Sequence, residues 1–396
     1  MKIQVAKQDL EAALQVVSPS LAGSGNASDI STHFLFRVVP QSDNSDSWDA
    51  EVLTYTGQLC AKAPFISRVE IDSAEVTSFS TRKFWPSFSI EGKRLKALLR
   101  VVSQAALTFD HDGTVTTVTT PRGPQVFQSL DPKKYPYWDQ TLTSAKLVAT
   151  VPASGLRRAF SWARLFVSEE ESRRPDLCVF ESKKGTIFAT NQRGAALVTV
   201  PSMEKSTLRV HGKEAAALIG FLDTIADGDV EVLECDRALY LRRSDGAVFG
   251  EYRHNVTFPD NLKMGQITSD PQWWEVPVQD LDQSIQFLKS GADDKDNRLR
   301  FKEGPNGSVT LEMARVFGDT HAVQSVPCES GSEEEAPPLQ KGGFLLDHIE
   351  LKKVLAINED ETLRFGVHQR KRSGFVRFSF SNDGIGCQVI IAWLGE

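Results

Sequence analysis

The sequence lacks any apolar run that could cross a membrane. No stretch approaches the roughly 18 consecutive apolar residues that a spanning helix needs. The chain opens with MKIQV, which is typical of a strand and contains no apolar signal region. Hydrophobic residues make up 40% of the chain, which is too many for a wholly disordered protein. We therefore expect a soluble globular protein that resides in the cytoplasm.

Closely spaced cysteines and an excess of basic charge are also missing. The five cysteines are odd in number, far apart and without a C-x-x-C pair, so neither a disulfide framework nor a zinc site is indicated. We predict reduced thiols and no metal or other cofactor. The formal net charge is −7 at pH 7. That total alone does not indicate a nucleic-acid partner, because phosphate binding usually accompanies a basic balance.

Catalytic motifs are absent as well. The sequence contains no phosphate-binding loop, no dinucleotide-binding fingerprint, no H-E-x-x-H and no G-x-S-x-G. The tetrapeptide DHDG at 110–113 has the composition of an acid/base or metal cluster, but Asp and Gly are also what a hairpin turn requires. We predict a turn there and no enzymatic activity. The enzyme alternative would place a site at Asp110 and His111.

What the sequence does contain is a repeated alternation of one amphipathic helix with several short strands. Runs of β-branched and aromatic residues, bounded by Gly, Asp, Asn or Pro, follow each helical segment. Six segments carry apolar residues at the 3.6-residue period of a helix with one buried face. They are 9–17, 93–102, 155–167, 213–225, 279–289 and 349–357. The pattern predicts an α+β fold built from six similar half-repeats.

Six half-repeats in 396 residues group most simply into three domains, because single cores rarely grow beyond about 250–300 residues. Segments 133–143 and 259–274 contain Pro and aromatic residues and are interpreted as connectors. Segment 329–343 is acidic, rich in Pro and Gly, and predicted to be a mobile surface loop. The three predicted domains span 1–140, 145–265 and 275–396.

Basic residues gather on three of the predicted helices, away from the apolar stripe. A solvated outer face accounts for any one such helix. The same basic face on several helices of a repeated architecture indicates contacts with phosphates. The helix over 279–289 carries Asp280 and Asp282 and does not share the pattern. The candidate phosphate-contacting residues are Lys93, Lys96, Arg100, Arg157, Arg158, Arg164, Lys352 and Lys353.

The opening MKIQVAKQDLEAALQVVSPSLA resembles the first strand and helix of bacterial-type DNA polymerase sliding clamps, the DNA polymerase III beta family. Residues 147–260 are most similar to the middle clamp domain, which carries an Ala-Thr-Asp-Gly-His-Arg turn and a later Phe-Pro-Asp. This chain has ATNQRG at 189–194 and an intact FPD at 258–260. The likeness covers nearly the whole chain through the order of all six half-repeats. The altered turn and C-terminus are typical of a divergent or phage-borne version.

The resemblance implies the clamp fold, with three similar domains that each contain two helix-plus-sheet half-repeats. Two subunits would close head to tail into a six-domain ring around duplex DNA, with the basic helices facing the channel. Such a ring tethers the replicative polymerase and performs no catalysis. The implied partners are duplex DNA without sequence readout, DNA polymerase, a clamp loader, other proteins with clamp-binding motifs and a second copy of the chain. Neither a membrane nor a cofactor is implied.

The resemblance also implies a cleft between the middle and last domains that receives a short tail containing Gln, Leu and Phe. An ordinary buried terminal strand is the alternative for the last six of its residues. Carried over one by one, the cleft residues are Thr190, Gln192, Arg193, Pro259, Lys263, Met264, Val389, Ile390, Ile391, Ala392, Trp393 and Leu394.

Ring closure would place Val126 and Phe127 of one subunit against Phe287 and Leu288 of the other. A plain core position is the alternative for Phe127 and Leu288. The alternative for the whole protein is a clamp-fold adaptor or decoy that forms no ring and binds the tails of polymerase or loader proteins. The solution mass distinguishes these two functions.

Overall fold

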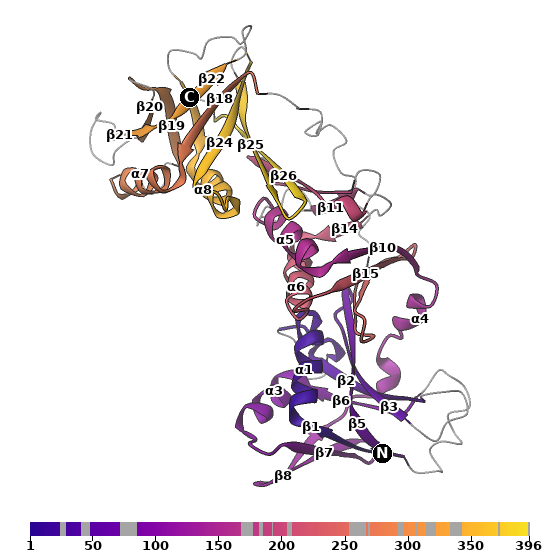
Figure 1. The fold of residues 1–396 in the computed structure, drawn as a ribbon. Coiled ribbons are helices and arrows are strands. Elements are labelled where there is room, and N and C mark those ends of the chain that lie inside the picture. The colour runs from indigo at the N-terminus through magenta and orange to yellow at the C-terminus, as the bar shows by residue number, and fades with distance from the viewer. Residues whose placement is uncertain are drawn as a thin grey trace. The chain divides into compact units, whose positions relative to one another are not determined.

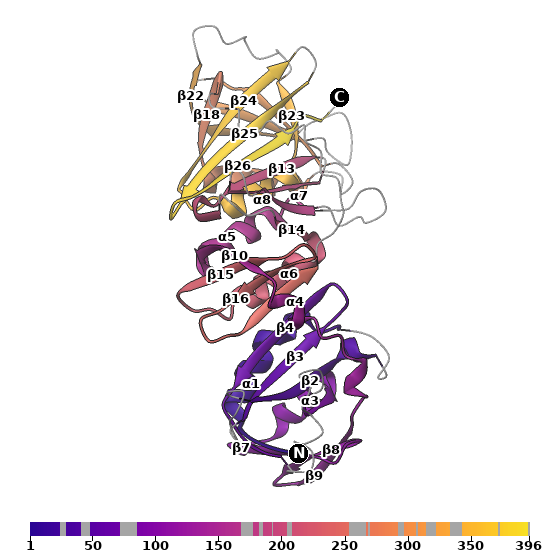
Figure 2. The same ribbon diagram turned by 90° about the vertical axis from the view of Figure 1, so that its right-hand side faces the viewer.

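The protein is described by a computed structural model in which the chain divides into two compact units (Figures 1 and 2). Unit 1 comprises Met1–Arg157 and Lys213–His254, and unit 2 comprises Arg158–Gly212 and Asn255–Glu396. The residues that the structure describes are 1–23, 29–40, 48–71, 85–167, 177–181, 185–191, 193–203, 208–252, 267, 270–291, 297–305, 308–313, 322–332, 343–370 and 373–394. Each unit combines parts of two predicted domains, and the three domain boundaries stay a prediction.

Each predicted amphipathic segment forms a helix. They are α1 (Lys7–Val17), α3 (Gly92–Val101), α5 (Ala153–Arg164), α6 (Gly212–Leu222), α7 (Val278–Ser290) and α8 (His348–Ile357). The apolar stripe is buried in each case, as Leu95 and Leu99 on α3 and Leu281 and Ile285 on α7 illustrate. The prediction of a helix over each of these six segments is therefore confirmed. None of the helices in the described part of the chain is long and apolar enough to span a membrane.

Unit 1 contains two antiparallel sheets. The five-stranded sheet has the order β5 (Ser67–Glu70), β1 (Lys2–Ala6), β7 (Ala106–His111), β8 (Val115–Thr120), β9 (Gly123–Gln128). The eight-stranded sheet has the order β10 (Lys146–Pro152), β15 (Asp229–Glu234), β16 (Ala238–Arg242), β17 (Val248–Tyr252), β4 (Leu59–Phe65), β3 (Trp48–Tyr55), β2 (His33–Pro40), β6 (Ser87–Glu91). The pairing of β17 with β4 joins strands from two half-repeats far apart in sequence.

Unit 2 also contains two antiparallel sheets, and α7 and α8 contact each other beside them (Figure 1). The nine-stranded sheet has the order β14 (Leu208–His211), β11 (Leu177–Glu181), β12 (Thr186–Thr190), β13 (Gly194–Thr199), β26 (Ile385–Ala392), β25 (Ser373–Asn382), β24 (Thr362–Arg370), β18 (Gln272–Pro277), β22 (Glu329–Ser332). The four-stranded sheet has the order β21 (Ala322–Pro327), β20 (Ser308–Met313), β19 (Arg298–Glu303), β23 (Phe344–Asp347). Here β13 pairs with β26, which is the counterpart of the long-range pairing in unit 1.

The predicted connector over 133–143 belongs to the core of unit 1. It contains the short helix α4 (Asp139–Leu142). Tyr135 and Trp138 are each only 2% exposed and pack with residues of β3, β4, β16 and β17. These two aromatic residues are therefore core residues, which pack over the paired strands β17 and β4.

Two local predictions have clear outcomes. The DHDG segment is a hairpin turn, because the Asp112 carboxylate accepts the backbone N–H groups of Thr114 and Val115 and Gly113 has a φ of 103°. The prediction of a mobile loop over 329–343 is wrong for its first four residues, which form β22 at the edge of the nine-stranded sheet. Gly331 permits this pairing, since a Cβ there would lie 2.7 Å from atoms of the Trp273 ring.

Candidate functional site

Helix α3 presents predicted phosphate-contacting residues to solvent. Lys93 and Arg100 are exposed and form no ion pair with any residue that the structure describes. Lys96 is half-buried, with its ammonium group 5.6 Å from the centre of the Phe34 ring. Burial lowers the pKa of Lys96, and the nearby Arg100 lowers it further. The two exposed cations are therefore better placed than Lys96 to meet a phosphate.

Helix α5 presents arginines that are partly neutralised. Arg157 pairs with Asp223 at 3.2 Å, and Arg158 pairs with Asp383 at 2.7 Å. Arg164 is exposed and has no such acidic partner within the described ranges. A cation that already pairs with a carboxylate contributes less to an anion-binding surface, so the prediction applies most directly to Arg164.

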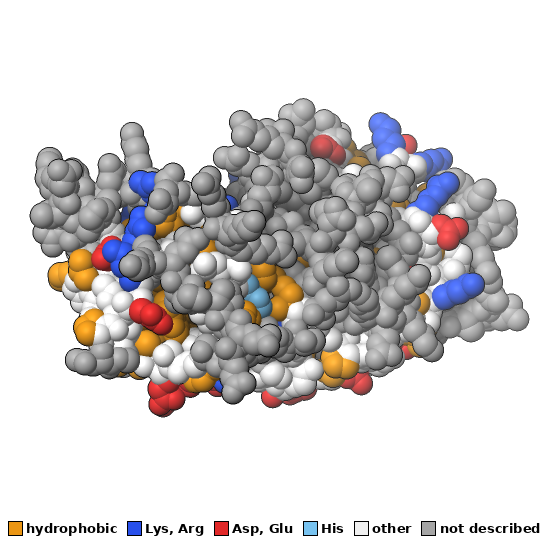
Figure 3. Space-filling view, turned by 90° about the horizontal axis from the view of Figure 1, so that it is seen from above, with side chains coloured by type: hydrophobic (Ala, Val, Ile, Leu, Met, Phe, Trp, Pro, Cys, Tyr) orange, Lys and Arg blue, Asp and Glu red, His pale blue; other side chains and the backbone are white. Residues whose placement is uncertain are grey.

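Helix α8 shows the same contrast between two adjacent lysines. Lys352 is exposed, and no described residue forms an ion pair with it. Lys353 is 23% exposed and its Nζ lies 2.8 Å from Oε1 of Glu350. In the space-filling view of Figure 3, the described Lys and Arg side chains on that face stand in small groups with acidic side chains nearby.

Two of the predicted cleft residues share one face of the nine-stranded sheet. Thr190 pairs with Ala195 and Ala195 pairs with Ile390, so these three side chains form a row on the same face. Phe188, Ala195, Leu197 and Ile390 form one hydrophobic cluster on this face. Leu197 and Ile390 are only partly buried by the described residues. Sequence reasoning missed Phe188, Ala195 and Leu197. They come to lie beside Ile390 only through the pairing of β12, β13 and β26, which the sequence does not reveal.

The C-terminal strand alternates between two environments. Val389 and Ile391 are fully buried on the opposite face from Ile390, so they support the strand from within the core. Ala392 is exposed, and its N–H donates to the carbonyl of Arg193 at 3.0 Å. The alternation follows from the two-residue period of a strand.

The last described residues are tied to the fold through backbone and ring contacts. Trp393 stacks on Phe344 with ring centres 5.2 Å apart, and its backbone N–H donates to the carbonyl of Gly374. Leu394 donates its N–H to the carbonyl of Leu345. Four further predicted cleft residues lie outside the described part of the chain; they are Gln192, Pro259, Lys263 and Met264.

The turn between β12 and β13 is attached to the start of α8. The Asn191 Oδ1 atom accepts the N–H groups of Arg193, at 3.0 Å, and of Gly194, at 2.8 Å. Nη1 of Arg193 lies 2.6 Å from Oδ2 of Asp347, a carboxylate that is 1% exposed. Asp347 also caps α8 by accepting the N–H of Ile349. An Asp directly before an apolar helical stripe is an N-cap signal, which could have identified Asp347 from the sequence.

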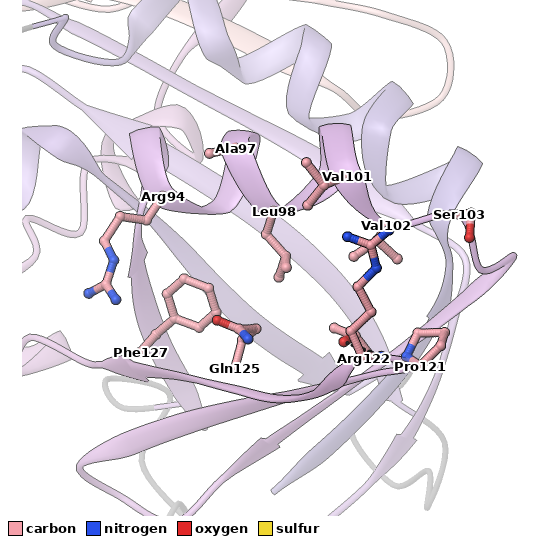
Figure 4. A pocket seen from close by; sticks show the side chains of 11 residues that line it. Arg94, Ala97, Leu98, Val101, Val102, Ser103, Pro121, Arg122, Gln125 and Phe127 are labelled. Atoms are coloured by element: carbon pink, nitrogen blue, oxygen red, sulfur yellow. Dashed lines mark hydrogen bonds between the residues drawn. The ribbon is translucent and has the colours of Figure 1, made fainter.

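One edge of unit 1 holds the first pair of predicted subunit-contact residues. Val126 on β9 is 55% exposed, whereas Phe127 is 4% exposed and lies beneath the guanidinium of Arg94 at 5.3 Å. A cavity of about 420 Å³ lies between α3 and the strands β8 and β9. Figure 4 shows Leu98 pointing into it from the helix, with Gln125 and Phe127 on the strand opposite. Val101, which is 62% exposed, also lines it.

One edge of unit 2 holds the second pair. Phe287 on α7 is 56% exposed, whereas Leu288 is fully buried in the core. The edge strand β21 packs against α7 and carries Val323, which is 51% exposed. Sequence reasoning missed Val101 and Val323, because an exposed valine cannot be told from a buried one by its type.

Comparison with solved structures identifies the fold. No protein-family model matches the chain, and no curated protein matches it in sequence. The structure is similar to the DNA polymerase III subunit beta of Pseudomonas aeruginosa, with a TM-score of 0.79, 14% identity and 100% of both chains covered. It is also similar to the beta subunit of Thermotoga maritima, with a TM-score of 0.78, 14% identity and coverage of 100% of this chain and 99% of the other.

A third similar structure is the DNA polymerase sliding clamp of Bacillus subtilis, with a TM-score of 0.76, 15% identity and coverage of 100% of this chain and 99% of the other. These comparisons show that the chain has the α+β fold of sliding clamps. The fold predicted from the order of the six half-repeats is therefore confirmed over the whole chain.

Proposed function

We propose that the protein is a DNA sliding clamp that closes with a second copy into a ring around duplex DNA in the cytoplasm. It tethers a DNA polymerase and thereby gives processivity, and it performs no catalysis. The observation that carries this proposal concerns the five-stranded sheet of unit 1 and the four-stranded sheet of unit 2. Each has about half as many strands as the other sheet of its unit, and exposed apolar side chains lie at one edge of each. The full-length likeness to sliding clamps supports the same function.

The sheet sizes support ring closure. In the described part of each unit, one sheet joins strands of two half-repeats and contains eight or nine strands, whereas the other sheet contains five or four. The five-stranded sheet ends at β9 and the four-stranded sheet ends at β21. Pairing β9 of one copy with β21 of another would produce a continuous sheet of the size already present in unit 2. It would also satisfy the free backbone groups of two edge strands.

Apolar exposure and charge support the same pairing. Val101 and Val126 are exposed at the β9 edge, and Phe287 and Val323 are exposed at the β21 edge. Contiguous exposed apolar side chains often mark protein interfaces. Charges at the two edges are complementary; Arg94 and Arg122 line the cavity beside β9, and Asp280 and Asp282 lie on α7.

The exposed cations support sequence-independent binding of DNA. Lys93, Arg100, Arg164 and Lys352 lie on three helices and have no acidic partner in the described part of the chain. Contacts between such side chains and phosphates are salt-sensitive and carry no base information, which permits sliding. The apolar face formed by Thr190, Ile390 and the neighbouring cluster supports a cleft for the short tails of polymerase, clamp loader and other clamp-binding proteins.

Sedimentation equilibrium over a concentration series tests ring closure. We expect a species of twice 43.8 kDa. Val323→Arg at the β21 edge should shift it to a monomer. Ile66→Arg is the matched control, because Ile66 is 81% exposed and directly precedes β5, at the opposite end of the five-stranded sheet from β9. A wild-type monomer at every concentration would overturn the ring and favour the adaptor or decoy.

Retention on nicked circular DNA tests the channel. Replacing Lys93 and Arg100 with Gln should shorten retention and reduce the salt slope by about one for each lost phosphate contact. The control replaces Arg157 and Arg158, which already pair with acids, and should have a smaller effect. Loss of binding to one base sequence only would contradict sequence-independent contact.

A further inference from the structure

The buried carboxylate of Glu350 connects the turn between β12 and β13 to a lysine on the same helix. Glu350 is 4% exposed. Its Oε1 atom accepts hydrogen bonds from Nδ2 of Asn191 at 2.8 Å and from Nζ of Lys353 at 2.8 Å. One oxygen therefore serves the turn that carries Thr190 and Arg193 and also a candidate phosphate-contacting cation.

Lys353 is the cationic partner of the Glu350 carboxylate. Its second oxygen, Oε2, is buried and has no hydrogen-bond partner in the part of the chain that the structure describes. Asn191 is neutral, so Lys353 is the cation that balances the carboxylate within hydrogen-bond distance. A buried carboxylate without a counter-charge is costly, and the group then moves or takes up a proton. Removing Lys353 therefore disturbs the bond between Glu350 and Asn191.

Close packing transmits such a disturbance to the turn. A Cβ at Gly194 would lie 3.0 Å from both Oε2 of Glu350 and the Phe166 ring, so the backbone of the turn is in direct contact with both groups. The Lys353 ammonium lies 5.7 Å from the centre of the same Phe166 ring. The turn, the carboxylate, the lysine and the ring form one packed group, which we call the Glu350 relay.

We propose that Glu350 is a positioning residue of the tail-binding cleft and that its hold on the turn depends on Lys353. This inference rests on the proposed function. A DNA phosphate that attracts Lys353 leaves Glu350 with Asn191 alone, loosens the turn and weakens tail binding. Because coupling between two sites is reciprocal, a bound tail stabilises the relay and weakens the contact between Lys353 and the phosphate. The Glu350 relay thus couples the occupancy of the DNA channel to the cleft.

The test compares two adjacent lysines on α8. Lys353→Met and Lys352→Met remove the same charge from the same helix, but only Lys353 bonds to Glu350. The probe is a fluorescein-labelled Gln-Leu-Ala-Leu-Phe pentapeptide, with affinity measured by fluorescence anisotropy. We expect Lys353→Met to weaken binding about fivefold, at the lower end of typical coupling effects, and Lys352→Met to leave it unchanged. Equal affinities of the two variants would overturn the inference.

A charge exchange distinguishes positioning from mere packing. Asn191→Asp keeps the acceptor for the N–H groups of Arg193 and Gly194 but places a carboxylate against Glu350, so we expect weaker peptide binding. Adding Glu350→Gln restores a donor–acceptor pair between the two side chains and should restore affinity. Failure of this rescue, with both variants folded, would contradict a directed bond between these positions.

Two further measurements separate this inference from the proposed function. Amide hydrogen exchange of residues 190–194 needs no peptide and should accelerate in Lys353→Met but not in Lys352→Met. Adding a short duplex should weaken peptide binding to the wild type and not to Lys353→Met. A wild type that binds neither peptide nor DNA would overturn the proposed function and this inference together. A wild type that binds both, with no difference between the two lysine variants, would overturn the inference alone.

Discussion

In each unit, one strand pairing connects two half-repeats; we call this pairing the joint. Different residues pack over the joint in the two units. In unit 1, β17 pairs with β4, and the connector residues Tyr135 and Trp138 bury the neighbouring strands. In unit 2, β13 pairs with β26, and the described residues there form only a small cluster around Phe188 and Ala195. The same strand pairing therefore serves as a closed core in one unit. In the other it leaves apolar side chains partly accessible, where we propose the cleft.

One charged contact at the joint of unit 2 is more exposed than the network at the joint of unit 1, whereas a second contact in unit 2, between Arg377 and Asp270, is largely buried. In unit 1, Arg37 is 4% exposed and lies between Glu51 and Asp139, which fixes the connector to the sheet. In unit 2, Arg193 is 59% exposed although its partner Asp347 is buried. A fully buried network is costly to open, because each group would lose its partner in a low dielectric. A half-exposed pair can open at lower cost, which suits a surface that accepts a partner.

The largest effect on stability is expected in unit 1, where the joint is closed by buried aromatic residues. Trp138→Ala removes a 2% exposed indole that stacks on Tyr240 and should lower the free energy of unfolding of unit 1 by about 3–5 kcal/mol. Guanidinium unfolding followed by circular dichroism measures the loss, and hydrogen exchange assigns it to unit 1. Gln140→Ala, exposed on the same connector, should be nearly neutral. Equal losses for the two variants would show that the connector does not stabilise the joint.

The next effect concerns Asp270 in unit 2, which binds Arg377 and His368. Burial alone would raise the pKa of Asp270, but the hydrogen bonds from His368 and Arg377 lower it to about 2, from an ordinary value of 3.8. The folded-state pKa is depressed, so the stabilisation is present above the ordinary value and is lost as the pH falls through about 2. Asp270→Asn should therefore cost roughly 2 kcal/mol at neutral pH.

Urea unfolding of the wild type and Asp270→Asn from about pH 6 down to about pH 2.5 checks this linkage. The difference in stability between the two proteins should be constant at the upper end and shrink below the ordinary pKa of an aspartate. A difference that does not change with pH would mean that the carboxylate charge is not what binds Arg377.

A smaller effect is expected at the joint of unit 2. Gly194→Ala places a methyl group 3.0 Å from Glu350 and Phe166 and should cost about 1 kcal/mol. Gly386→Ala is the matched control in the adjacent strand, where the nearest atom, in Thr199, is 3.9 Å away. Urea unfolding should show the control unchanged or slightly more stable. If Gly194→Ala is as well tolerated, the turn does not pack tightly on α8.

The smallest effect is expected for a surface pair outside both joints. Arg242 and Glu231 lie opposite each other on β16 and β15, with side chains 40% and 37% exposed. Arg242→Met should change the free energy of unfolding by less than about 0.5 kcal/mol, because water screens exposed pairs. Arg37→Met at the buried joint is the contrasting variant and should be much more destabilising. Similar values in urea unfolding would mean that burial does not strengthen the contacts of Arg37 at the joint of unit 1.

Local patterns in the sequence were sufficient to predict the helices and several turns. The stripe of Leu95 and Leu99 specifies the buried face of α3, and Asp112 with Gly113 specifies a hairpin, because both patterns act within a few residues. The edge strand β22 was predicted incorrectly as part of a loop. Its residues have weak strand propensity, and pairing with β18 outweighs that propensity.

The candidate site was predictable only in part. Charge and helical period identified Lys93, Arg100 and Lys352 as exposed cations. The same reasoning could not show that Arg158 pairs with Asp383, because the two residues are 225 positions apart. For the same reason, Glu350 drew no attention as a binder of Asn191, which lies 159 positions away.

The order of the half-repeats, the helical faces and the hairpin turns follow from the amino-acid sequence, because these features depend on neighbours a few residues apart. Which strands join the half-repeats, which cations remain unpaired and which carboxylate holds the turn of the candidate cleft depend on the folded chain. Those features arise from contacts between distant segments. A hydrogen bond or an ion pair between residues far apart in the sequence forms only once the tertiary structure has brought both partners within about 3 Å.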